Sequence, residues 1–212
     1  FKILFTNSYS PHKNLSPDEF LDIKIDWLIK NRRVDDLENL LMTNTQVGEK
    51  SKAIKFLVEE YLSSADVKSA CEKIKFVNKD VQDNFLEKFN IYCLIYEDRE
   101  NEAQLMLDLL NEKGSKDIFF ENKINFLLGL NNTTNQKIVD NNIFNFYLSQ
   151  ITSKDFTYKP DEKTDKYIWR YLTAANLIQI ENFEDEETIK TYERAASSDT
   201  FEKKEIFNIY KN

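Results

Sequence analysis

The stretch Phe89–Leu110, FNIYCLIYEDRENEAQLMLDLL, decides the fold that this sequence predicts. Apolar residues recur at helical spacing in two runs, which the polar turn Glu97-Asp98-Arg99 separates. Side chains at this spacing share one face of a helix, so each run predicts a helix with one buried face. The residues that form these two faces are Ile91, Leu94, Ile95, Ala103 and Leu107. We therefore expect two helices folded back on each other as a hairpin.

The same pattern recurs every 33 residues on either side of this hairpin. Four successive units keep three apolar positions in the first helix: Ile25, Leu28 and Ile29; Val58, Tyr61 and Leu62; Ile91, Leu94 and Ile95; Ile124, Leu127 and Leu128. Three units keep two positions in the second helix: Leu37, Ala70 and Ala103, and Leu41, Ile74 and Leu107. The fourth unit loses the second register, because Gln136 and Asp140 stand where apolar residues are due. Two faces that keep one register predict a stack of helical hairpins.

The sequence divides into four parts. Residues 1–15 predict an extended lead-in, and residues 16–152 predict the hairpins, beginning at the capping box Ser16-Pro17-Asp18-Glu19. Residues 153–164 predict a linker, and residues 165–212 predict C-terminal helices at 165–180, 185–197 and 200–211 that pack on the same stack. The chain has only 3 glycines and 3 prolines, which also favours helices over strands.

Composition and motifs argue against several classes of protein. The net charge of −8 argues against nucleic-acid binding, and the longest apolar run, residues 91–96, is far shorter than the ~20 residues of a membrane span. The chain has no P-loop, GxGxxG, GxSxG or HExxH motif, so we predict no enzyme, no catalytic residue and no cofactor. We also predict no metal site: His12 is far from both cysteines, and the acidic run 184–187 precedes a predicted helix, where negative charge complements the helix dipole.

These paired helices resemble tetratricopeptide-type repeats over about residues 17–128. The positions that match the family pattern are the small residues Ala70 and Ala103, the large apolar residues Leu41, Ile74 and Leu107, and Tyr61 of the first helix; Leu37 is a poorer match. The positions that depart from it are Ile25, Val58, Ile91 and Ile124, where the family has a small residue. The closing proline is also absent, and the period is one residue short. The resemblance implies an all-α fold, a right-handed α-solenoid of antiparallel helix pairs.

In such a solenoid the first helices line a concave surface, which we call the first-helix face. The resemblance places ten residues on it: Asp22, Asp26, Lys30, Lys55, Glu59, Lys88, Tyr92, Tyr96, Glu121 and Asn125. Mixed charges with two tyrosines suit a protein or peptide better than a polyanion. We therefore expect a non-enzymatic scaffold that binds a protein or peptide partner.

The segment from Ile91 to Leu110, followed by Ile118-Phe119-Phe120, is also similar to a group of uncharacterised alphaproteobacterial helical-repeat proteins that are exported. As in that group, one cysteine, Cys71, stands in a second helix and the other, Cys93, in the next first helix. These helices are neighbours in a stack. If the protein is exported, we expect either a disulfide between the two cysteines or two buried thiols. The similarity favours a periplasmic or exported location over the cytoplasm. The chain begins at Phe1 without a methionine, and we expect a processed or trimmed product.

Two other functions stay open on the sequence. The half of the chain beyond Phe119 is rich in aromatic residues. The alternative function is therefore a protein that binds or acts on a small molecule or glycan, in a pocket lined by Trp169, Tyr171 and paired carboxylates. A structural subunit of an envelope assembly is the third reading, and it predicts a large apolar surface patch.

Overall fold

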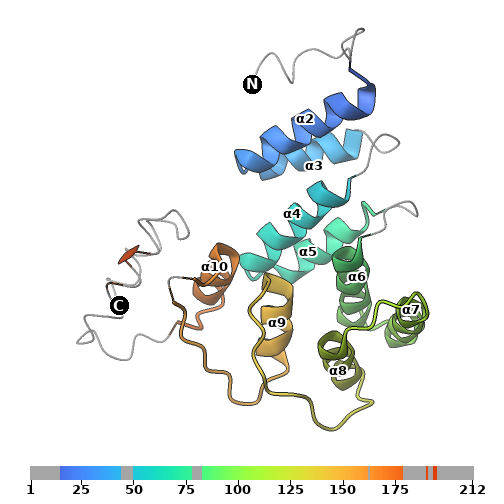
Figure 1. Ribbon diagram of the computed structural model, residues 1–212, viewed down its shortest axis with the longest axis vertical. Helices are drawn as coiled ribbons and strands as arrows, with labels where there is room; N and C mark the ends of the chain where they lie inside the picture. Colours follow the sequence, from blue (N-terminus) through green and yellow to red (C-terminus); the bar gives the residue numbers. More distant parts are fainter. Residues whose placement is uncertain are drawn as a thin grey trace.

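The computed structural model describes residues 15–43, 50–77, 83–161, 163–178, 190, 193 and 194. Throughout these residues the regular structure is helical, which confirms the all-α prediction. The helices are α2 (Pro17–Lys30), α3 (Val34–Thr43), α4 (Ser51–Ser63), α5 (Val67–Ile74), α6 (Asn84–Tyr96), α7 (Glu100–Glu112), α8 (Ile118–Leu127), α9 (Ile143–Ile151) and α10 (Lys166–Ala174) (Figure 1). The predicted lead-in up to residue 14, His12 and the acidic run 184–187 lie outside the described residues. Of the helices predicted beyond 178, only residues 190, 193 and 194 are described, and these three are helical.

Polar side chains cap the starts of six of the described helices. At the start of α2, the Ser16 hydroxyl accepts a hydrogen bond from the Glu19 amide at 3.2 Å, and the Glu19 carboxylate accepts one from the Ser16 amide at 2.7 Å. This pair is the predicted capping box, and it satisfies amides that have no partner inside the helix. The residues that cap the later helices in a similar way are Asp66, Asp83, Asp117, Asn142 and Asp165.

The first six helices form three hairpins, α2–α3, α4–α5 and α6–α7, whose turns share one geometry. The turn residues Arg32, Ala65 and Asp98 all have positive φ angles, of 48°, 58° and 59°. In each turn the following amide reaches back to a carbonyl near the end of the first helix: Arg33 to Leu28, Asp66 to Tyr61 and Arg99 to Leu94, at 2.9, 3.0 and 2.8 Å. Both sets of residues are spaced by 33, the period predicted from the apolar positions. This closure satisfies carbonyls left open at a helix end.

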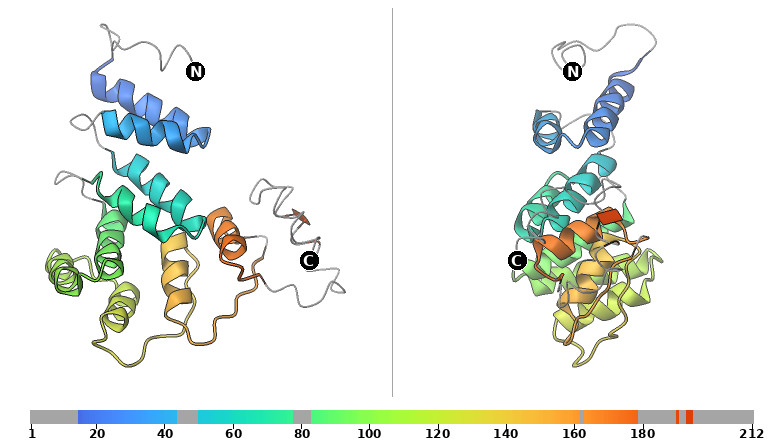
Figure 2. Two further views of the ribbon diagram at one scale, coloured as in Figure 1. Left: turned by 180° about the vertical axis from the view of Figure 1, so that it is seen from behind. Right: turned by 90° about the vertical axis from the view of Figure 1, so that its left-hand side faces the viewer.

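The chain then turns back toward the middle of the molecule. Helix α8 packs on α6, and α9 packs on α4 and α8. Residues 128–142, which we call the crossing segment, contain no helix and connect α8 to α9. Helix α10 packs on α4 and α9 (Figures 1 and 2). The predicted linker 153–164 runs beside α9, where the rings of Phe156 and Tyr158 contact Phe146 at centroid distances of 5.6 and 4.8 Å. A buried lysine, Lys123 of α8, holds the crossing segment by donating to the Asn135 carbonyl at 2.6 Å and the Thr152 hydroxyl at 2.8 Å.

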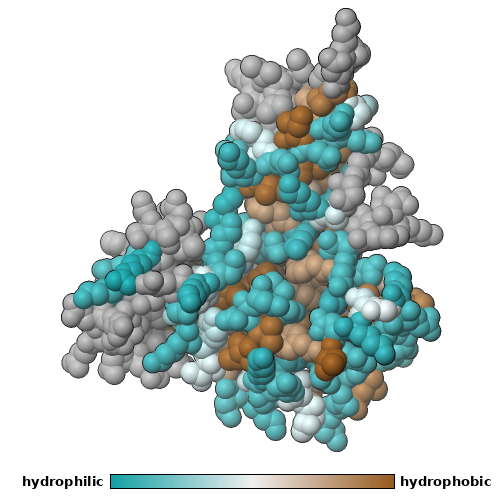
Figure 3. Space-filling view, in the orientation of Figure 1, coloured by the Kyte–Doolittle hydropathy of each residue, from teal (hydrophilic) through white to brown (hydrophobic). Residues whose placement is uncertain are grey.

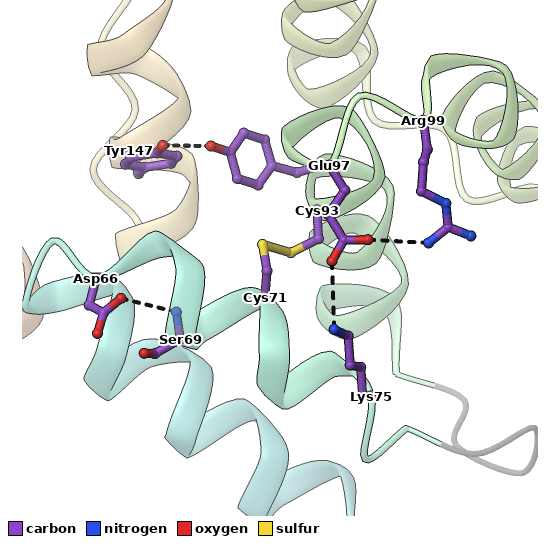
Figure 4. Close-up of a disulfide and its surroundings, with 9 residues drawn as sticks. Asp66, Ser69, Cys71, Lys75, Cys93, Glu97, Arg99 and Tyr147 are labelled. Atoms are coloured by element: carbon purple, nitrogen blue, oxygen red, sulfur yellow. Dashed lines mark hydrogen bonds and ion pairs between the residues drawn. A yellow bond between two sulfur atoms is a disulfide. The ribbon is translucent and has the colours of Figure 1, made fainter.

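A disulfide joins the second hairpin to the third. It links Cys71 of α5 to Cys93 of α6, whose Cα atoms are 5.4 Å apart, and both cysteines are buried (Figure 4). Beside it, Lys75 and Arg99 both lie within ion-pair distance of Glu97, at 3.9 and 3.2 Å. The bond therefore sits at the point where a second helix packs against the next first helix.

Candidate functional site

The first-helix face divides into an exposed part and a covered part. On α2, Asp22, Asp26 and Lys30 are exposed, and at the end of α6 so is Tyr96. The half-buried members of the face are Lys55, Glu59, Lys88, Glu121 and Asn125. The prediction that Tyr92 faces a partner is wrong, because its side chain is only 4% exposed.

Tyr92 is buried because α9 lies against this part of α6. Its hydroxyl shares a hydrogen bond of 2.6 Å with the hydroxyl of Tyr147 in α9. One turn earlier, the rings of Phe89 and Phe144 meet edge to face with centroids 5.0 Å apart. Burial raises the pKa of Tyr92 to about 12 and raises the pKa of Tyr147 further, so both hydroxyls are neutral. The chain's own α9 therefore covers position 92.

Helix α10 covers the neighbouring part of α4. The buried carboxylate of Glu60 accepts hydrogen bonds from Arg32, in the turn of the first hairpin, and from Arg170 of α10. Burial alone would raise the pKa of Glu60, but the hydrogen bonds from the two guanidinium groups outweigh it and hold this pKa below its usual value. Glu60 thus connects three parts of the chain that are distant in sequence.

Most charges predicted for the face already have partners within the molecule. Lys88 pairs with Asp117 at 2.7 Å, and its ammonium lies 5.6 Å from the centre of the Phe120 ring. The ammonium of Lys55 lies 4.9 Å from the centre of the Phe85 ring, and Asp26 pairs with Lys52. Burial raises the pKa of Glu59 to about 7, with Lys55 opposing the shift and Asp165 adding to it. These contacts join α2 to α4, α4 to α6, and α6 to the start of α8.

The exposed part contains a residue that sequence reasoning missed. Ile23 of α2 is 45% exposed, although it stands 33 and 66 residues before the buried Phe56 and Phe89. Helix α2 packs against α3 and α4, while α9 and α10 lie on α4 and beyond. Hydrophobic surface over α2 is visible in Figure 3. The 33-residue spacing could have identified Ile23, because it relates Ile23 to Phe89, the residue of α6 that Phe144 of α9 covers.

The aromatic side chains of α9 and α10 pack against each other. Trp169 and Tyr171 of α10 are both buried, and the Tyr171 ring lies 5.7 Å from the ring of Tyr147 and 6.2 Å from that of Phe146. The Tyr171 hydroxyl donates to the Gln150 side chain at 2.9 Å. Within the described ranges, no group of three or more histidine, cysteine, aspartate or glutamate side chains is arranged to hold a metal ion. Trp169 and Tyr171 therefore belong to the buried core.

Comparison of the chain with models of protein families, with curated proteins and with solved structures finds no match. Among the helices that the structure describes, none is both long and apolar enough to cross a membrane.

Proposed function

We propose that this protein is a non-enzymatic scaffold that binds a protein or peptide on the α2 part of the first-helix face. The observation that carries this proposal is the exposure of Ile23 at a position whose counterparts, Phe56 and Phe89, are buried. On α6 the occupant of this surface is a helix, α9, which places Phe144 on Phe89. A partner segment seated on α2 would bury Ile23 in the same way.

The proposal includes the architecture that the sequence predicts. Three hairpins with turn residues spaced by 33 support a tetratricopeptide-like, right-handed α-solenoid, in which stacked first helices form one continuous surface. Helices α9 and α10 then cover the later part of that surface, while Ile23 of the first hairpin is 45% exposed. Asp22 and Lys30 place opposite charges near Ile23, which suits a partner of mixed charge with an apolar anchor.

The alternative function, a pocket for a small molecule or glycan in the aromatic half, has less support. Trp169 and Tyr171 would have to line that pocket, but both are buried, and the Tyr171 ring packs on Tyr147 of α9. An interaction surface needs no such cavity, so the packing favours the scaffold.

Site-specific crosslinking tests the proposal. A photoreactive amino acid replaces Ile23 in one variant and Met42 in a control; Met42 is an exposed apolar residue of α3 in the same hairpin. In cells of the source organism we expect a discrete crosslinked protein from position 23 and none from position 42. The partner identified in this way should then bind the Ile23→Asp variant at least about tenfold more weakly than the wild type, and the Met42→Asp variant normally.

Two results would contradict the proposal. One is a set of crosslinks that is the same from both positions, because then α2 has no preferred partner. The other is an intact, folded chain that turns over a substrate while the Ile23→Asp substitution has no effect on binding any protein.

A further inference from the structure

The outward face of α7 carries two exposed leucines one helical turn apart. Leu105 is 59% exposed and Leu109 is 43% exposed, while Ala103, Leu107 and Leu110 of the same helix are buried. Residues four apart lie on one stripe of a helix, so the two leucines form a single apolar strip. The buried side of α7 is complete without them.

The equivalent positions of the other hairpins show that this strip is particular to the third. Leu105 corresponds at the 33-residue spacing to Asn39 in α3 and Glu72 in α5, which are polar and exposed. Leu109 corresponds to Thr43, also exposed, and to the half-buried Phe76. The fold therefore tolerates polar side chains where α7 presents leucine, and packing within the chain does not require Leu105.

Helix α7 also lies at an edge of the stack. Helices α3 and α5 each pack on the first helix of the next hairpin, α4 and α6. Helix α7 packs mainly on α6, since the following helix, α8, packs on α6 and α9 instead. Figures 1 and 2 show α7 at the margin of the molecule, opposite α10.

Acidic side chains flank the leucine strip on both sides. With 100° between successive residues, Glu102 lies to one side of Leu105, Asp108 lies to the other, and Glu112 follows two turns later; all three are exposed. Glu102 pairs with Arg99 at 2.7 Å, and Asp108 accepts a hydrogen bond from the Gln104 amide at 3.0 Å. The rim of the strip is therefore negative, with two of its three carboxylates outside any ion pair formed by the described chain.

We propose that this strip, formed by Leu105 and Leu109 with the rim Glu102, Asp108 and Glu112, is a second docking surface that receives a basic amphipathic helix of a partner protein. The apolar side of such a helix covers the leucines, and lysine or arginine side chains beside it meet the acidic rim. A second copy of this chain is a poor occupant, because two α7 faces would bring like charges together on a molecule of net charge −8.

The test uses the intact protein and a defined probe, a fluorescent 18-residue peptide of leucine and lysine whose leucines fall on one helical face. A control peptide has the same composition in an order that destroys this face. Fluorescence anisotropy at ~0.15 M salt should show that the amphipathic peptide binds at least about tenfold more tightly than the control peptide.

Matched variants locate the binding. Leu105→Asn with Leu109→Thr gives α7 the residues that α3 carries at these positions, and it should weaken peptide binding about tenfold without loss of folding. Neutralising the rim with Glu102→Gln, Asp108→Asn and Glu112→Gln should weaken it several-fold. Removing three exposed carboxylates from the first hairpin, with Asp18→Asn, Asp22→Asn and Asp35→Asn, should change it little. The Ile23→Asp variant should bind the peptide normally, which separates this surface from the one on α2.

Three outcomes would overturn the proposal. Equal binding of the two peptides, or equal loss from rim and first-hairpin neutralisation, means that net charge alone attracts them. Normal binding by the Leu105→Asn/Leu109→Thr variant means that the strip is not the contact. A dimer of the wild type that this variant dissociates, measured by light scattering, means that a second copy is the occupant.

Discussion

The hydroxyls of Tyr92 in α6 and Tyr147 in α9 share a buried hydrogen bond of 2.6 Å, although 55 residues separate them. The two rings also meet edge to face, with centroids 5.4 Å apart. This contact holds α9 against α6, and α9 there covers a residue that we predicted on the first-helix face. The position of α9 therefore decides which part of that face stays accessible.

Breaking this hydrogen bond from either side should destabilise the fold. Tyr147→Phe leaves the buried Tyr92 hydroxyl without its partner, which should lower the free energy of unfolding by about 1–2 kcal/mol. The double variant Tyr92→Phe/Tyr147→Phe removes both hydroxyls and should be less destabilised than the sum of the single changes. Urea denaturation of the four proteins measures this coupling. Strictly additive losses would show that the two hydroxyls do not interact.

The disulfide should make a measurable contribution to stability. Cys71 and Cys93 are 22 residues apart, and closing a loop of this size in the unfolded chain is worth about 3 kcal/mol. A reducing agent should therefore lower the melting temperature of the wild type by several degrees. The variant Cys71→Ala/Cys93→Ala is the control, because it should melt at a lower temperature that the reductant does not change. An equal effect of the reductant on both proteins would contradict this prediction.

The hairpins were predictable from the sequence because each one repeats a local pattern. Apolar positions at helical spacing predicted α2 to α7, and Ser16 marked the first helix start. The turns carry Arg32, Ala65 and Asp98 in a conformation that usually favours glycine, so only their spacing could reveal them.

The covering of the first-helix face was not predictable in the same way. It depends on contacts such as Phe89 with Phe144, between segments that no periodicity relates. The tetratricopeptide pattern placed Tyr92 on the first-helix face, but the 33-residue register does not indicate where α9 packs. For the same reason, the exposure of Ile23 and Leu105 follows from which helices the chain folds back onto and which it leaves uncovered.

The hydrogen bonds that Arg32 and Arg170 donate to Glu60 should contribute to the stability of the fold. Arg32→Ala with Arg170→Ala leaves a buried carboxylate without either hydrogen-bonding partner, which should cost about 3–5 kcal/mol at neutral pH. Adding Glu60→Gln to this double variant should recover part of the loss, since an amide carries no charge. Thermal unfolding of the three proteins measures the effect. No recovery would show that the arginines act through packing and not through the carboxylate.

The pH dependence of stability should separate Glu60 from its neighbour Glu59. The pKa of Glu60 is lowered in the folded protein, so its contribution is present above the pKa of the unfolded chain and is lost as the pH falls through the folded pKa. The pKa of Glu59 is raised from 4.5 to about 7, so the folded state holds a proton that the unfolded state releases earlier. Glu59 therefore makes the protein less stable as the pH rises from 4.5 to about 7.

Glu59→Gln removes this titration and tests its sign. The glutamine variant should exceed the wild type in stability at pH 8 by about 1–3 kcal/mol and should match it near pH 5, where the wild-type carboxyl is mostly protonated. The control is Glu121→Gln, which removes another half-buried carboxyl, in the first turn of α8. Chemical denaturation from pH 5 to pH 8 measures both curves. The contrary result is a stability difference between Glu59→Gln and wild type that stays constant over this range. It would show that Glu59 titrates normally in the folded chain and that the contact between α4 and α10 does not depend on its proton.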